Sequence, residues 1–217
     1  MVKTGDSTLK HRFPIWVRDL HLYLGLFLSP FVLLFALSAV FLNHGWRPGP
    51  EQPVPVRRAL AGLEIPPGIE ASSGIERIRL LRPLLERAGV TGEVGPINYR
   101  RSQSRMTVPV TQAGRAVTVE IDLAHRTGTV VERTTGVWDG LVYLHKMPGQ
   151  HLVSIRKNWL ATRLWSWSAD ATVYLLLFVT ASGVYLWLAV RSRRRAGLLL
   201  LAAGVLTFGA TVYALCR

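Results

Sequence analysis

The residues of this chain best suited to bind a cofactor are its histidines, at positions 11, 21, 44, 125, 145 and 151. Imidazole is a common axial ligand of haem iron, and two imidazoles on facing helices hold a haem between them. His44 and His145 are expected to lie at the same membrane interface, so we predict that they hold a haem, with His151 as an alternative to His145. Spacing also fits a plainer interpretation, in which each histidine is a hydrogen-bonded anchor.

His21 is expected to lie at a different depth in the membrane from His44 and His145. It is 23 residues from His44, which is about 34 Å along a helix, so the two imidazoles cannot share one ligand. His21 would therefore ligate a haem only together with a histidine from another chain. Phe41, Trp46, Trp138 and Tyr143 are aromatic residues that could line the gap around the His44–His145 pair. We expect His11 and His125 to be surface residues.

The elements that must position these histidines are three uncharged runs, at 22–42, 171–190 and 196–216. About 20 apolar residues span a bilayer core as a helix. We therefore predict transmembrane helices at 21–44, 170–190 and 196–216. The single cysteine, Cys216, excludes an intrachain disulfide and a multi-thiolate metal site.

Charge predicts the orientation of these helices. The chain carries a net charge of +13, and the loop at 191–195 has four arginines in five residues. Under the positive-inside rule this loop and the basic tail at 1–20 are cytoplasmic, which places residues 45–168 in the periplasm. A basic segment on that side faces anionic lipid headgroups, so nucleic-acid binding is not expected.

The segment between the first two spans is predicted to contain a small α+β unit. Residues 45–71 are a Pro-rich linker, with six of the twelve prolines between 48 and 67. The unit at 72–133 has one helix that ends at Gly89 and an antiparallel meander. Its strands are predicted at 93–101, 106–111, 115–123 and 129–133. Residues 134–169 form an interfacial re-entry segment with an amphipathic helix at about 136–146.

Several enzyme and transporter classes lack support in the sequence. There is no P-loop, G-x-S-x-G, H-E-x-x-H or C-x-x-C motif. The predicted spans contain no internal carboxylate, lysine or arginine, which a proton pump or transporter would normally carry.

Five short motifs together resemble the PepSY-associated transmembrane family. They are RDLHLYLGL at 18–26, LSAV at 37–40, LHK at 144–146, Asp170, and TASGVYLW at 180–187. The similarity covers about residues 11–195, with the α+β unit resembling a PepSY module. This chain differs from larger members in having three spans rather than four or more, Ala39 where a glycine is common, and no flavin or nicotinamide domain.

The resemblance implies a function in iron uptake. Larger relatives include inner-membrane ferric-siderophore reductases that carry haem b on helix histidines, and relatives often accompany TonB-dependent uptake. By this resemblance His21 matches the first-helix histidine and His145 the histidine of the leucine–histidine motif. PepSY modules elsewhere inhibit or regulate peptidases.

We therefore expect a multi-pass protein of the bacterial inner membrane, made of three transmembrane helices and a periplasmic PepSY-like α+β module. The first hypothesis is an accessory or haem-b-bearing electron-transfer component of iron and siderophore uptake, which as an enzyme would be a ferric-siderophore reductase. The alternative is a non-catalytic PepSY module that binds a protein partner. Expected partners are the bilayer, a membrane or periplasmic protein or a second copy of the chain, and a ferric siderophore.

Overall fold

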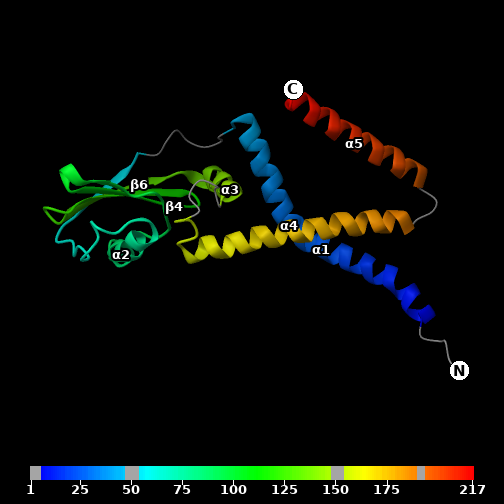
Figure 1. Cartoon of the computed structure of the whole chain (residues 1–217), viewed down its shortest axis with the longest axis horizontal. Helices are drawn as coiled ribbons and strands as arrows, with labels where there is room; N and C mark the ends of the chain where they lie inside the picture. Colours follow the sequence, from blue (N-terminus) through cyan, green and yellow to red (C-terminus); the bar gives the residue numbers. More distant parts are fainter. Residues whose placement is uncertain (1–5, 47–53, 148–153, 190–193) are drawn as a thin grey trace. The chain divides into compact units, whose positions relative to one another are not determined.

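The computed structural model describes residues 6–46, 54–147, 154–189 and 194–217, with side chains from residue 12 onward (Figure 1). It divides into two compact units, one made of Met1–Phe31 with Ala171–Arg217 and the other of Val32–Asp170. His151 and residues 191–193 of the arginine loop lie outside the described residues.

Among the residues that the structure describes, three helices are long and apolar enough to cross a membrane, as the uncharged runs predict. They are α1 (Asp6–His44), α4 (Leu160–Ala189) and α5 (Arg194–Leu215). Helix α4 begins ten residues before the predicted start at 170, inside the segment that was predicted to be interfacial. Hydropathy marks only the apolar part of a helix, and residues 160–169 contain no glycine or proline to end the hydrogen-bond ladder.

The segment between α1 and α4 contains the predicted antiparallel sheet. Its strands are β1 (Val56–Leu60), β2 (Glu93–Val94), β3 (Asn98–Arg100), β4 (Arg105–Gln112), β5 (Arg115–Asp122) and β6 (Thr127–Thr134). Their order is β1-β6-β5-β4-β2, and β3 also pairs with β4. The strand predicted at 93–101 is thus two short strands, because Gly95 and Pro96 interrupt it.

The prediction that residues 45–71 are only a linker is wrong for its central part. Strand β1 pairs along its whole length with β6, from Val56 opposite Glu132 to Leu60 opposite Gly128. Its side chains do not alternate between buried and exposed, so the sequence carries no period of two. Backbone hydrogen bonds to β6 form this edge strand, and prolines flank it without interrupting it.

Helix α2 (Gly74–Arg87) packs on one face of the sheet (Figure 1). Its buried side chains Ile78, Leu81, Leu84 and Leu85 follow the predicted helical period, and they meet valine, isoleucine and methionine side chains of β4, β5 and β6. The helix ends at the predicted glycine in a Schellman motif: Gly89 has φ +69°, its N–H bonds Glu86 O, and the Val90 N–H bonds Leu85 O.

Helix α3 (Gly136–Lys146) confirms the helix predicted at 136–146 and carries His145. It is held against the β4–β5 turn at Gly140, where an added Cβ would lie 3.1 Å from the backbone nitrogen of Gly114. Tyr143 Oη donates to Thr111 O at 3.4 Å. The sheet therefore sets the position of the helix that presents His145.

Candidate functional site

His145 forms a hydrogen bond with a buried serine of α1. Its Nδ1 lies 2.8 Å from Ser38 Oγ, and Ser38 has no exposed surface. Ser38 Oγ also lies 2.9 Å from Phe35 O, so its single hydrogen has two acceptors within reach, that carbonyl and an unprotonated Nδ1. When the hydrogen goes to Phe35 O, the serine oxygen accepts from His145 Nδ1–H, and Nε2 of the neutral ring keeps its lone pair.

The aromatic ring of Phe35 contacts this imidazole, and Trp165 of α4 packs near Phe35. The Phe35 ring packs edge-on, with centroids 5.7 Å apart, and Trp165 lies 6.1 Å from Phe35. Trp165 Nε1 donates to Leu144 O at 3.0 Å, which ties α4 to the last turn of α3. Helices α1, α3 and α4 thus hold His145 in one half-buried orientation within the second unit.

His21 has the same arrangement in the first unit. Its Nδ1 lies 2.9 Å from Ser182 Oγ of α4, a side chain that is only 6% exposed. Ser182 Oγ also lies 3.1 Å from Val179 O, so here too His21 Nδ1–H is the donor when the serine hydrogen goes to the carbonyl. The ring lies against Gly183, where an added Cβ would be 3.3 Å from His21 Cε1.

The two sites share one arrangement, an imidazole whose Nδ1 is next to a buried serine hydroxyl. With the proton on Nδ1, the Nε2 lone pair can ligate a metal or accept a proton. A hydrogen bond from Nδ1–H to a neighbouring group is typical of metal-bound histidines, because it sets the tautomer and the ring direction. The imidazole and the Phe35 ring beside it are group types that suit a haem ligand at His145. Each site supplies one imidazole, and the described residues contain no cluster of three or more His, Cys, Asp or Glu that could hold a metal ion.

The other predicted ligands lie elsewhere. His44 Nδ1 bonds Val40 O of its own helix at 3.0 Å, and its ring lies 4.9 Å from Trp46. Contacts between α1 and α3 join Ser38 to His145 and Phe41 to Trp138, so α3 runs antiparallel to the end of α1. His44 is six residues, or about 9 Å of helix, beyond Ser38. Its pairing with His145 stays a prediction.

His125 and His151 have different outcomes. His125 is a surface residue, as predicted: its Nδ1 and backbone N–H both lie 3.0 Å from the Asp122 carboxylate, and these bonds lower the pKa of Asp122. His151 lies outside the described residues, so its role as the alternative to His145 stays a prediction.

Sequence reasoning missed a buried polar network where α4 begins. Both oxygens of Glu93, which is 6% exposed, accept backbone N–H groups: Oε1 from Asn158 at 3.1 Å and Oε2 from Trp159 at 3.0 Å. Arg82 donates to Asn158 Oδ1 at 2.7 Å and to Gly92 O at 3.2 Å. The sequence shows Glu93 only as a lone carboxylate at the start of a strand. Strand periodicity does not reveal that this carboxylate binds the backbone just before α4, 65 and 66 residues away.

The same asparagine ties the network to the sheet. Asn158 Nδ2 donates to Val94 O at 2.7 Å, and Val94 N–H donates to Asn158 Oδ1 at 3.0 Å. The side-chain amide therefore pairs with β2 as another strand would. Helix α2, strand β2 and the start of α4 are joined in one hydrogen-bonded unit, which we call the Glu93 latch (Glu93, Asn158 and Arg82).

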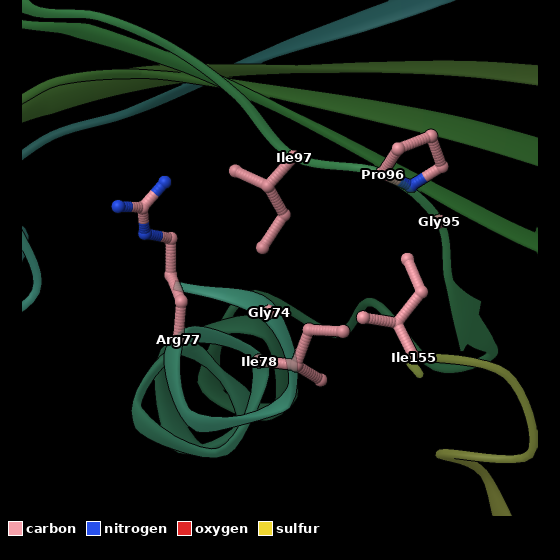
Figure 2. Close-up of a pocket in the computed structure, with 7 residues that line it drawn as sticks. All are labelled: Gly74, Arg77, Ile78, Gly95, Pro96, Ile97 and Ile155. Carbon is pink, nitrogen blue, oxygen red and sulfur yellow. The ribbon is translucent and has the colours of Figure 1, made fainter. Parts of the chain in front are cut away.

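Two cavities lie beside α2. The smaller, of about 200 Å³, is shown in Figure 2: Ile78, Ile97 and Ile155 face it, and Arg77 stands at its edge. The Arg77 guanidinium bonds Ser72 O and lies 5.4 Å from the Tyr99 ring centroid, so it braces the loop before α2. The larger cavity, of about 700 Å³, lies between α2 and residues 60–67.

Tyr143 and Glu132 are among the further titratable groups in this part of the chain whose pKa values are displaced. Burial raises the pKa of Tyr143, whose hydroxyl is next to the β4 backbone. The hydrogen bond from Arg115, 2.7 Å long, lowers the pKa of Glu132 across the β5–β6 pair. Both groups serve to hold strands and α3 together.

Comparison of the chain with family models, with curated proteins and with solved structures gives no match.

Proposed function

We propose that this chain is a haem-b-bearing electron-transfer component of the bacterial inner membrane, with His145 Nε2 and His21 Nε2 as iron ligands. The observation that carries the proposal is the repeated histidine–serine arrangement. At two places a buried serine hydroxyl lies within hydrogen-bond distance of both a carbonyl of its own helix and a histidine Nδ1. The resemblance of the flanking motifs to the PepSY-associated transmembrane family supports the same function.

The roles of the residues follow from their contacts. Ser38 holds the Nδ1 side of the His145 ring against α1, so Nε2 points away from that helix, and Phe35 covers one side of the ring. Ser182 orients the His21 ring through its hydroxyl. Gly183 has no side chain, which leaves room for the His21 ring against α4. Haem, when bound, supplies one-electron exchange at its iron.

A haem bound at either site would be held by a second residue besides the imidazole that the site offers. For His145 the predicted ligand is His44 or His151. For His21 a histidine from another chain is needed, so a second copy or a partner protein completes the inner site. The proposed acceptor on the periplasmic side is a ferric chelate such as a siderophore.

The test is a reduced-minus-oxidised spectrum of the full chain, purified after expression with haem precursor, together with iron analysis. We expect a b-type α-band that falls by about half in His145→Ala and in His21→Ala. His125→Ala is the matched control, because that ring is on the surface, and it should leave the spectrum unchanged. Absence of both the α-band and iron from the native chain would refute the proposal.

His44→Ala tests the predicted ligand pair separately. If His44 is the partner of His145, its loss removes the same part of the spectrum as His145→Ala does. An unchanged spectrum in His44→Ala, with loss in His145→Ala, would assign the second ligand to another residue.

One observation favours the alternative function, a non-catalytic binding module. The larger cavity beside α2 has a volume within the range of about 300–1,000 Å³ that is usual for small-molecule sites, and it lies far from either imidazole in the sequence. A chain without haem that still binds a ligand there would be a binding module.

A further inference from the structure

The larger cavity is a groove with apolar walls. One wall is residues 60–67, which link β1 to the loop before α2, and the other is the α2 face that carries residues 79, 80, 83, 84, 87 and 88. Positions 79, 83 and 87 are four residues apart, and so are positions 80, 84 and 88. The two rows lie side by side and form a continuous stripe about 14 Å long. The apolar side chains that line it include Leu60, Leu63, Ile65, Leu80, Pro83 and Leu84.

The groove is held open by contacts at its edges. Leu63 N–H bonds Arg126 O at 2.9 Å, which anchors the linking segment to the β5–β6 turn. An ion pair joins Glu64 to Arg87 across the groove, and Arg58 donates to Ala88 O at one end. The two walls are thus fixed to the sheet and to each other at both edges, while about 700 Å³ between them stays open.

The charge of the rim is positive. Arg79 and Arg87 lie on the groove, eight residues apart on α2, and the acidic group that lines it is Glu64. Arg87 is paired with that glutamate, whereas Arg79 has no ion-pair or hydrogen-bond partner among the residues that the structure describes. An exposed guanidinium at the edge of an apolar groove is suited to bind an acidic headgroup, with two parallel N–H donors available to it.

We propose that this groove binds an anionic amphiphile: a single carboxylate or phosphate head at Arg79, with a hydrocarbon chain along Leu80, Pro83 and Leu84. The apolar walls select the chain and the unpaired arginine selects the charge. Such molecules are available to this module, because helices long enough to span a membrane precede and follow it in the sequence. The proposed binding does not depend on haem, so it is tested separately from the electron-transfer function.

Photolabelling of the full chain in phosphatidylcholine nanodiscs tests the proposal. The probe is dodecanoic acid with a diazirine on its chain, and labelled peptides are mapped by mass spectrometry. We expect labels on residues 60–67 and 79–88, reduced about tenfold in Arg79→Gln, since a charge-assisted contact is lost. Arg105→Gln is the matched control, because Arg105 is an exposed arginine at the start of β4, away from the groove.

Further arms separate the alternatives. The same labelling with a diazirine-bearing phosphatidylglycerol distinguishes a membrane lipid from a free fatty acid as the source of the head, and groove labelling by either probe supports the proposal. Leu80→Trp, which fills the groove without changing its charge, should also abolish labelling. Labels confined to α1, α4 and α5, equal groove labelling by diazirine-bearing dodecanol, or unchanged labelling in Arg79→Gln would each overturn it.

Discussion

Replacing Glu93 by alanine should release the start of α4 from the sheet. The carboxylate accepts two backbone N–H groups, from Asn158 and Trp159, and is 6% exposed. A hydrogen bond to a charged group contributes about 1.5–3 kcal/mol, so two contribute about 3–6 kcal/mol. Relief of the buried charge offsets part of this, and we expect a net loss of about 2–4 kcal/mol in local stability.

Hydrogen–deuterium exchange of the full chain in detergent measures this loss at the residues concerned. A loss of about 2–4 kcal/mol corresponds to roughly 30-fold or faster exchange at Asn158, Trp159 and the first turn of α4. Glu93→Gln keeps one acceptor oxygen and should show an intermediate effect. Glu86→Ala is the matched control, because Glu86 is an exposed glutamate on α2, and its effect should stay within about 0.5 kcal/mol.

The Glu93 latch is also connected to His145 through α4. Trp165, six residues after Trp159, donates to Leu144 O beside His145. If exchange at the start of α4 is unchanged in Glu93→Ala relative to Glu86→Ala, the carboxylate does not cap this helix. The connection from the sheet through α4 to His145 would then be refuted.

Three more predictions follow from single contacts. Ser38→Ala removes the hydroxyl that bonds His145 Nδ1, and if haem is bound we expect its affinity to fall about 10- to 100-fold by spectral titration, with Ser38→Thr restoring most of it. In Gly140→Val the added Cβ would lie 3.1 Å from the backbone nitrogen of Gly114, so the free energy of unfolding, measured with denaturant, should fall by about 1–3 kcal/mol. Val137→Ala, at an exposed position of the same helix, should change this free energy little. Because Arg115 lowers the pKa of Glu132, the stability difference between the native chain and Glu132→Gln should be present above the ordinary glutamate pKa of about 4.3 and should disappear as the pH falls through the lowered value; a difference that persists in acid would contradict this.

Much of the α+β unit could be predicted from local pattern. Helix α2 follows from apolar residues at helical spacing and a glycine stop, and β4, β5 and β6 lie within two residues of the predicted strands, since alternation and turn residues are local signals. Strand β1 could not be predicted, because its side chains are exposed and its partner β6 is about 70 residues away. The Glu93 latch was missed for the same reason.

The sequence by itself determined three apolar helices and the presence of a histidine in or beside the first, because chain length, hydropathy and charge are sums over neighbouring residues. It could not decide which atom each histidine offers. That depends on Ser38 and Ser182, which are 107 and 161 residues from the rings they contact. A serine has one hydrogen to donate, and only the folded helices bring each serine hydroxyl within reach of both its own backbone carbonyl and an imidazole nitrogen.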